Sequence, residues 1–382
     1  MKQWPVLLSI FCATVSSKKR TLVRPLEPGA VHLKGWLGDK IDLCVQNGIS
    51  SRGVENLLAP FRTRTETSCW QTEPTMHMQE TCVTQTLMKL LYKLYQITGD
   101  PALIDQMEIS ACNALLGAMK PDGSSFAKYS PLIGFRQEGE EQCGMGMDCC
   151  TANGPRGLLQ IPQFAVMREK SGAVINLFEA LEAVAQTPSG KSLIIRQSSD
   201  YPVSGQVQFR LQLKQKERFT VKIRIPAWSD SARLTINDRE ELQPASGAYH
   251  LIDRVWKDND LICLTLDLRP RWQQQPADRH RHVALMRGPL VQARDQRWDS
   301  GDVDEPAKPQ QEQGDWAFHP ITTLPGCWFS CTTSCTLGDF LEMELGRPRN
   351  LTLVDYASAG NTWSRESRFR VWWPLALNPM EP

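Results

Sequence analysis

The chain lacks a basic excess, a long apolar span and a compact disulfide framework. Its 382 residues carry 43 Lys and Arg against 42 Asp and Glu, a formal net charge of +1. No surplus of cations is therefore available to hold nucleic acid or an anionic membrane. No stretch is long enough to cross a bilayer as a helix. The 12 cysteines are spread through a chain much longer than a disulfide-stapled small domain.

What the sequence does contain is typical of a globular protein with two or three domains. Hydrophobic residues make up 41% and charged residues 22%, which is enough to bury a sizeable core. Residues 1–20 include an apolar run, Pro5 to Val15, that resembles a short signal peptide. With cleavage and export the protein would be secreted or periplasmic, and otherwise cytoplasmic. Residues 21–71 form a turn-rich N-terminal segment.

Residues 72–187 have helical periodicity. A helix is predicted from Met76 to Thr98, a second from Pro101 to about Met119, and a third from Arg156 to about Phe164. The first helix carries apolar residues at three- and four-residue steps, which predicts that this stripe is the buried face. The stripe consists of Leu87, Leu90, Leu91, Leu94 and Ile97.

Strand patterns dominate after Thr187. Short alternating or β-branched runs separated by turn residues predict a β-sandwich over residues 188–300 and a further β-rich segment over 301–382. The fold class is therefore α+β and multidomain. The 12 tryptophans pack in such a core or stack on sugars. The predicted strands are Lys191–Gln197, Gln206–Leu213, Phe219–Ile225, Arg233–Asn237 and Leu261–Leu268, and the candidate sugar-stacking residues are Trp228, Trp256 and Trp328.

Glu80, Cys82, Cys149 and Cys150 are the candidate metal ligands. Three thiolates and a carboxylate can form a tetrahedral zinc shell. Residues two apart on a helix point in nearly opposite directions, so Glu80 and Cys82 need a non-helical turn at the helix start, and adjacent cysteines need a kinked backbone. Three alternatives to a metal site remain. Cys82 can be a small buried residue on the core face of its helix, and Cys149 and Cys150 can form a vicinal disulfide. Glu80 can simply be a carboxylate near a helix N-terminus, where the helix dipole favours a negative charge.

Several motifs carry a resemblance to a known family. They include an E-x-C segment and a double-cysteine loop, together with motifs in the predicted β region. These motifs are TEPTMHMQETCVT (72–84), NALLG (113–117), PDG (121–123), QCGMGMDCC (142–150), RIPAW (224–228), RGPL (287–290) and LVDYA (353–357). In these features the chain resembles the β-L-arabinofuranosidase family, glycoside hydrolase family 127, over most of residues 72–373.

The resemblance implies a fold and a chemistry. The fold is an (α/α)6 helical barrel followed by β-sandwich domains, and the cofactor is Zn²⁺. Cys149 is implied as the nucleophile of a retaining glycosidase that releases L-arabinofuranose or a related sugar from plant-type glycans. Glu80, Cys82 and Cys150 complete the zinc shell. Glu108 falls where the family has a pocket glutamate that orients a sugar hydroxyl, although it can equally be an ordinary exposed helix residue.

Two features depart from the family pattern. The family's acid/base glutamate, about sixteen residues before the E-x-C segment, falls on Arg64, and neither Glu66 nor Glu73 has its sequence context. Twelve barrel helices need roughly 200 residues, whereas residues 72–187 supply about 115. We therefore expect an internal deletion with its seam near Gln71–Thr72.

The alternatives to an active enzyme are an inactive truncated member with a structural zinc and a carbohydrate-binding β-sandwich protein. The oligomeric state is not determined by the sequence.

Overall fold

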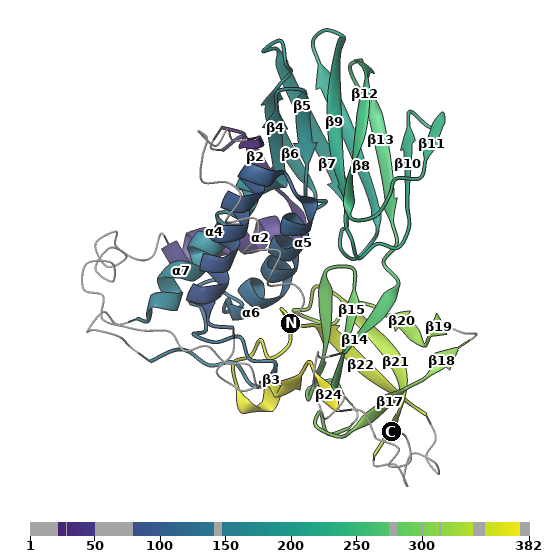
Figure 1. Cartoon of the computed structure of the whole chain (residues 1–382). Helices are drawn as coiled ribbons and strands as arrows, with labels where there is room; N and C mark the ends of the chain where they lie inside the picture. Colours follow the sequence, from purple (N-terminus) through teal and green to yellow (C-terminus); the bar gives the residue numbers. More distant parts are fainter. Residues whose placement is uncertain are drawn as a thin grey trace, which may run out of the picture.

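A computed structural model describes residues 22–27, 29–49, 79–140, 147–274, 282–299, 301–312, 315–338 and 348–374. It has a helical part and two β parts, which lie side by side (Figure 1). The expected signal peptide, residues 1–20, lies outside the described residues. Among the residues that the structure describes, none of the helices is both long and apolar enough to cross a membrane.

The described helices come from the N-terminal half of the chain. Their assignment as part of an (α/α)6 barrel stays a prediction. The helices are α2 (Gly35–Leu43), η1 (Cys44–Ile49), α4 (Thr81–Thr98), α5 (Pro101–Ser110), η2 (Ala111–Leu115), α6 (Leu116–Ala118), α7 (Cys149–Leu158) and α8 (Ile161–Ala165), with a short 3-10 turn, η3 (Arg365–Ser367), near the C-terminus.

The break between α4 and α5 follows from local sequence. Gly99 ends α4 in the left-handed conformation, with φ of 68°, which glycine adopts without steric cost. Asp100 then caps α5, its carboxylate accepting a hydrogen bond from the Ala102 N–H at 3.0 Å, and Pro101 takes the first helical position. The predicted helix boundaries at Thr98 and Pro101 are confirmed.

The buried face of α4 coincides with the predicted apolar stripe only in part, because Leu91 is buried at 8% exposure while most of the stripe is not. Leu87, Leu90 and Ile97 are 45%, 50% and 37% exposed. Met88 and Tyr95 are fully buried instead. Apolar residues occur on both sides of this helix, and the described neighbours cover only one of them.

The third predicted helix begins earlier than expected. Helix α7 starts at Cys149, and Pro155 lies inside it rather than before it. Asp148 caps the helix by accepting a hydrogen bond from the Thr151 N–H at 2.9 Å. Helix α8, Ile161–Ala165, follows after a short turn.

The upper β part contains two sheets, and the five predicted strands all occur in it (Figure 1). Strands β5 and β9 pair in parallel, while the other strand pairs among the described residues are antiparallel. In spatial order the five-stranded sheet contains β1 (Arg24–Pro25), β4 (Val166–Glu169), β5 (Gly172–Ile175), β9 (Glu217–Ile225) and β12 (Ala248–Trp256), and the seven-stranded sheet contains β11 (Glu240–Leu242), β10 (Ala232–Ile236), β13 (Leu261–Leu266), β8 (Gln206–Leu213), β7 (Ser192–Ser199), β6 (Leu181–Gln186) and β2 (Val31–Leu33).

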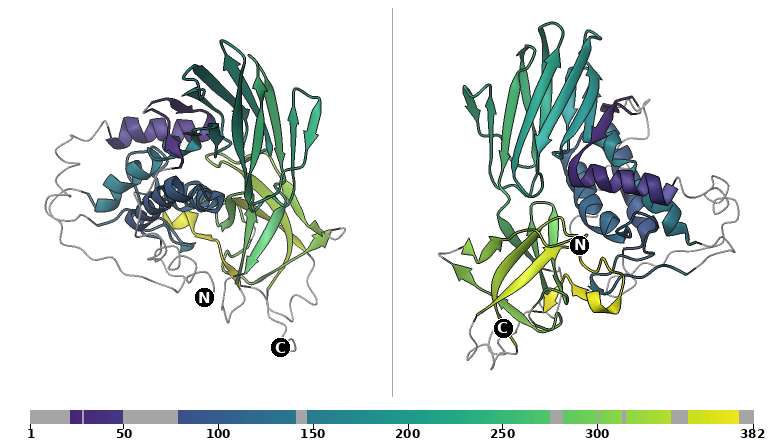
Figure 2. Two further views of the ribbon diagram at one scale, coloured as in Figure 1. Left: turned by 45° about the horizontal axis from the view of Figure 1, so that its top comes forward. Right: turned by 180° about the vertical axis from the view of Figure 1, so that it is seen from behind.

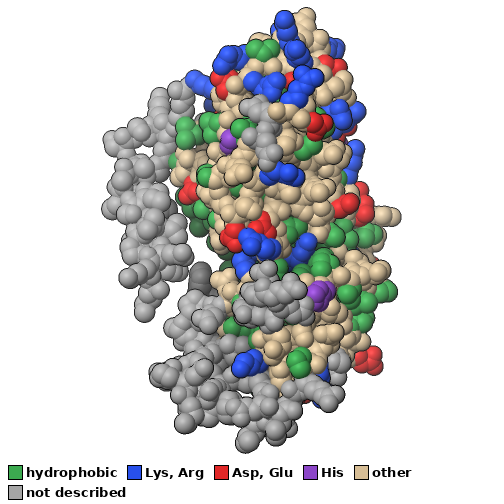
Figure 3. Space-filling model, turned by 90° about the vertical axis from the view of Figure 1, so that its right-hand side faces the viewer, with side chains coloured by type: hydrophobic (Ala, Val, Ile, Leu, Met, Phe, Trp, Pro, Cys, Tyr) green, Lys and Arg blue, Asp and Glu red, His purple; other side chains and the backbone are tan. Residues whose placement is uncertain are grey.

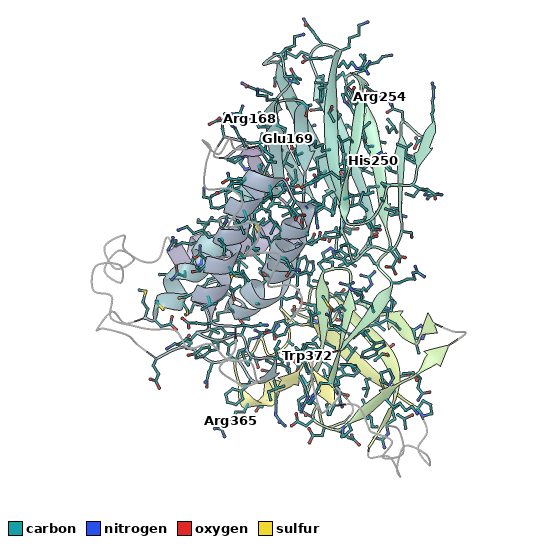
Figure 4. The ribbon with its side chains drawn as sticks, viewed as in Figure 1. Arg168, Glu169, His250, Arg254, Arg365 and Trp372 are labelled. Atoms are coloured by element: carbon teal, nitrogen blue, oxygen red, sulfur yellow. The ribbon has the colours of Figure 1, made fainter. Side chains whose placement is uncertain are left out.

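The sandwich begins before residue 188. Strands β4, β5 and β6 occupy 166–186, within the range expected to be helical. The N-terminal segment also contributes, since β1 pairs with β4 and β2 with β6. In Figure 4, Arg168 and Glu169 mark the end of β4, and His250 and Arg254 lie along β12 of the same sheet.

The lower β part begins near Pro270 rather than at residue 301 (Figure 2). Its strands form a ten-stranded sheet and a separate two-stranded ribbon. The main path is β14 (Pro270–Gln274), β15 (His282–Arg287), β16 (Leu290–Asp295), β22 (Arg349–Asp355), β21 (Ser330–Leu337) and β17 (Ala307–Pro309), joined by β3 (Ile133–Gly134), β20 (Phe318–Pro320), β23 (Phe369–Arg370) and β24 (Trp373–Pro374); the ribbon is β18 (Gln311–Glu312) with β19 (Asp315–Trp316).

Two of the three candidate tryptophans belong to the core. Trp256 has no exposed surface and donates its indole N–H to the Phe219 carbonyl at 2.9 Å. Trp328 is 6% exposed and stacks on Trp36 with ring centroids 4.3 Å apart. Trp228 is only partly buried, so it is the one of the three that retains a surface for a ligand.

Candidate metal-thiolate site

The four predicted metal ligands come together between two helices. Glu80 immediately precedes α4 and Cys82 is its second residue, while Cys149 and Cys150 begin α7. One ligand atom from each of the four residues lies within 4.8 Å of the others. Helices α4 and α7 pack against each other, which brings together residues about seventy positions apart in the chain.

The sulfur atoms are in direct contact. The Cys82 Sγ lies 3.1 Å from the Cys149 Sγ and 3.3 Å from the Cys150 Sγ. The Cys150 Sγ is also 3.9 Å from Glu80 Oε1 and 3.6 Å from the Lys128 carbonyl oxygen. No disulfide joins Cys149 and Cys150, so the vicinal disulfide is not formed.

Glu80 and Cys82 converge because the chain turns sharply just before α4. Gln79 adopts a left-handed conformation with φ of 51°, which costs a non-glycine residue of order 1–3 kcal/mol. The turn is held by the neighbouring segment: the Thr81 N–H donates to the Lys128 carbonyl at 2.9 Å, and the Thr81 hydroxyl to the Ala127 carbonyl at 2.7 Å. The predicted non-helical turn is confirmed.

The double cysteine needs no kink, contrary to expectation. Both residues lie in the first turn of α7, where free backbone N–H groups and the helix dipole favour a negatively charged sulfur. The Asp148 cap fixes the start of this turn by accepting from both the N–H and the hydroxyl of Thr151. A regular helix start therefore presents both thiols to the same point in space.

The electrostatics single out Cys149. Hydrogen bonds from the thiols of Cys150 and Cys82 lower the pKa of Cys149 to about 3. The same contact with Cys149 raises the pKa of Cys82 to about 12 and also raises the pKa of Cys150. Burial, followed by the charge of Cys149, raises the pKa of Glu80. The cluster thus holds its first negative charge on Cys149, while hydrogen bonding to Cys149 and burial oppose ionisation of Cys82, Cys150 and Glu80.

The side chain of Asn153, which was not among the predicted site residues, also contacts this cluster. The Asn153 side-chain amide donates to the Cys82 Sγ at 3.1 Å and to the Cys149 carbonyl at 3.2 Å. Arg156 orients Asn153 by donating to its Oδ1 at 2.9 Å. The available signal was spacing, because Asn153 is four residues after Cys149 and so lies on the same face of a helix.

The donor set fits a divalent, thiophilic metal. Three sulfurs and one carboxylate are the ligands of a tetrahedral zinc site, in which Zn–S bonds of about 2.3 Å place the sulfurs about 3.8 Å apart. The observed separations of 3.1 and 3.3 Å need widening by about 0.6 Å to match those bonds. A divalent ion would also offset the repulsion among four acidic groups.

The structure places Glu108 away from this cluster, at the contact between α5 and the sandwich. Its side chain has no exposed surface and pairs with Arg224 at 2.8 Å. The Tyr201 hydroxyl donates to Glu108 Oε1 at 2.8 Å, and the Trp228 indole N–H to Oε2 at 3.4 Å. Asp105 also pairs with Arg224. Glu108 is therefore not an exposed helix residue, and its contact with sugar stays a prediction.

A pocket lies beside the cluster. It has a volume of about 300 Å³ and is lined by the segment whose Lys128 carbonyl contacts Cys150. Its lining residues include Lys128, Tyr129, Phe135 and Glu138.

The structure does not describe the region of the expected acid/base position. Arg64, on which that position falls, and the nearby Glu66 and Glu73 all lie outside the described residues.

Comparison with known proteins gives two family matches. The catalytic-domain model of the family-127 β-L-arabinofuranosidases matches residues 65–163, and the middle-domain model of that family matches residues 172–268. A curated relative, the non-reducing end β-L-arabinofuranosidase of Bifidobacterium longum subsp. longum, is 26% identical over 242 residues. That alignment covers 59% of this chain and 36% of the relative.

Solved structures share the fold. A family-127 β-L-arabinofuranosidase from Geobacillus stearothermophilus T6 superposes with a TM-score of 0.66 at 18% identity, covering 91% of this chain and 61% of that one. A second family-127 β-arabinofuranosidase gives a TM-score of 0.65 at 22% identity, covering 78% of this chain and 49% of that one. The chain thus spans between about a third and three fifths of these relatives.

Proposed function

Because the chain belongs to glycoside hydrolase family 127, we propose that it is a retaining glycosidase acting on L-arabinofuranosides or related units of plant-type glycans. The observation that carries this proposal is the convergence of one carboxylate and three thiols within 4.8 Å. A second support is that Cys149, the nucleophile implied by the family, is the thiol whose pKa is lowered.

We propose Zn²⁺ as the cofactor, held by Glu80, Cys82, Cys149 and Cys150. When bound, zinc would keep the thiols deprotonated and offset their mutual repulsion. Asn153 would orient the Cys82 sulfur through its N–H···S contact at 3.1 Å.

The proposed reaction has two displacement steps. In the first, the Cys149 thiolate attacks the anomeric carbon, a C–S bond forms, the glycosidic C–O bond breaks, and the leaving oxygen takes a proton from a general acid. In the second, water attacks the same carbon, gives its proton to the conjugate base, and the C–S bond breaks to release Cys149. Two inversions give net retention. We assign the acid/base role to no residue.

The proposed contact of Glu108 with a sugar hydroxyl has weaker support. Its carboxylate is already paired with Arg224 and bonded to Tyr201. A sugar would have to replace one of these partners, and the present contacts favour a role in fixing α5 against the sandwich.

A second candidate function is an inactive, shortened family member with a structural zinc. The exposed apolar side chains of Leu87, Leu90 and Ile97 favour it, because a complete helical barrel would cover such a face. We propose an internal deletion near Gln71–Thr72 as the cause. Sequencing the full-length transcript tests the proposed deletion. Additional helical sequence between Gln71 and Thr72 would mean that the gene was assigned the wrong exons, whereas a continuous genomic reading frame across this junction would support a shortened protein.

Hydrolysis of an aryl β-L-arabinofuranoside tests the enzymatic proposal. We expect release of the aryl group, formation of a Cys149-linked sugar detectable by mass spectrometry, and loss of both in Cys149→Ala. Cys263→Ala is the matched control, because Cys263 lies on β13 outside the cluster. Zinc-loaded protein that releases no aryl group would favour the inactive alternative, and turnover retained by Cys149→Ala would refute the nucleophile assignment.

A further inference from the structure

A pocket at the junction of the two β parts is unrelated to the thiol cluster. It has a volume of about 370 Å³ and contains two aromatic side chains, within the size range of small-molecule sites. Figure 3 faces this side of the molecule and shows acidic and basic side chains gathered at mid-height, beside hydrophobic ones. Its principal lining residues are Trp228, Asp230, Asp267, Arg269, Arg271 and Phe318.

Trp228 forms a rigid aromatic wall of this pocket. Its indole N–H donates to the buried Glu108 carboxylate at 3.4 Å, and its ring lies nearly parallel to that of Tyr201, with centroids 6.4 Å apart. Gly288 packs against the edge of the ring, where an added Cβ would lie 3.6 Å from the indole. Phe318, from β20 of the other β part, is the second aromatic side chain. Both are partly exposed.

The polar groups of the pocket balance in charge. Asp267 is held by Arg269, whose Nη2 lies 2.6 Å from it, and Asp230 lies 3.9 Å from the same guanidinium. With Arg271, the pocket therefore has two carboxylates and two guanidinium groups. Such a set offers both acceptors and donors without a net charge.

Arg271 has hydrogen-bonding capacity that the described residues do not use. Its Nη2 contacts only the Met286 sulfur, at 3.9 Å, and its Nη1 is buried without an acceptor among the described residues. Burial lowers the pKa of the Arg271 guanidinium, and no carboxylate within the described part of the chain pairs with it. Arg271 lines the pocket, so a ligand oxygen beside its guanidinium would supply an acceptor that the described residues do not.

We propose that this pocket is a second carbohydrate-binding site, which takes a neutral sugar unit of a glycan. Aromatic side chains pack against the C–H face of a sugar ring, while carboxylates accept from its hydroxyl groups and guanidinium groups donate to them. Because its two carboxylates balance its two guanidinium groups, the pocket has no net positive charge to favour an anionic sugar such as a uronate. The site requires neither Cys149 nor a bound metal, so it stands whether or not the chain is an active glycosidase.

Titration of the full-length protein with neutral arabino- and xylo-oligosaccharides, followed by isothermal calorimetry, tests this proposal. We expect saturable binding at millimolar concentrations, weakened at least fivefold by Phe318→Ala and by Asp230→Ala. Asp230 is well suited because its side chain is 81% exposed, so its loss should not affect folding. Leu251→Ala, at a 57% exposed position on β12, is the control and should bind normally.

Two further comparisons separate this site from the thiol cluster and from acidic ligands. Cys149→Ala should bind the neutral oligosaccharides as the unmodified chain does, and oligogalacturonate should bind more weakly than they do. The proposal is overturned if neither neutral series binds, if Phe318→Ala and Asp230→Ala bind as tightly as the unmodified chain, or if oligogalacturonate binds best.

Discussion

Replacing Arg224 by methionine should strongly destabilise the protein. The Arg224 guanidinium has no exposed surface and pairs with both Asp105 and Glu108, whose side chains are 7% and 0% exposed. Its Nε also donates to the Asn176 carbonyl at 2.7 Å. Methionine retains much of the volume but leaves two buried carboxyl groups without a cation.

The expected magnitude follows from that loss of charge. Removing one partner of a buried ion pair costs about 3–5 kcal/mol, and for a unit of this size that corresponds to roughly 6–20 °C in melting temperature. Burial already raises the pKa of Glu108 while Arg224 opposes that shift. Without Arg224 the pKa of Glu108 should rise further, so acidification should recover part of the lost stability by neutralising Glu108.

Urea unfolding of Arg224→Met and of the unmodified chain, followed by tryptophan fluorescence at several pH values, measures both effects. Arg218→Met is the matched control, because Arg218 is 67% exposed and pairs with a half-exposed Asp253; it should lose no more than about 1 kcal/mol. Equal losses in the two variants, or a loss in Arg224→Met that grows as the pH falls, would refute the reasoning.

Three further outcomes are expected. Burial, then the charge of Glu108, raises the pKa of Glu179 from 4.5 to about 8. The stability that Glu179 contributes is therefore fully present below pH 4.5 and is lost as the pH rises through 8. Glu179→Gln should make the free energy of unfolding less dependent on pH between 4.5 and 8, and a pH profile identical to that of the unmodified chain would contradict the prediction. Asn153→Ala should weaken metal binding about 10–100-fold in competition with a chromophoric chelator, whereas Asn350→Ala, at an exposed position, should not. Met88→Ala should cost about 2–5 kcal/mol in urea unfolding, but Leu90→Ala under about 1 kcal/mol because that side chain is 50% exposed; equal costs would mean that Leu90 is covered in solution.

Each half of the ligand cluster is a local sequence signal, whereas only the resemblance to the family implied that the two halves meet, because they lie about seventy residues apart in the chain. Glu80 and Cys82 are two residues apart and Cys149 and Cys150 are adjacent, so simple backbone geometry already required a turn at the first pair. The start of α7 was missed because Pro155 was taken as its boundary, although the Asp148 and Thr151 spacing is that of a helix cap.

Long-range partners explain the remaining differences. Helix α4 carries apolar residues on two faces, and the elements packed against it determine that Met88 is buried and Leu87 exposed. Glu108 is buried by Arg224, more than one hundred residues later, a pairing that a single sequence does not reveal. Strand β6, Leu181–Gln186, has the sequence LEAVAQ, which is rich in helix formers, and it is a strand because β7 and β2 flank it.

The most direct test of the zinc-thiolate centre is the metal content of the purified chain by elemental analysis, beside a Cys149→Ala/Cys150→Ala variant. About one zinc per chain in the unmodified protein, and none in the folded variant, is the result that the ligand geometry predicts. Well-folded protein without zinc, or zinc retained by the variant, would contradict the assignment of this cluster as the metal site and with it the proposed cysteine chemistry.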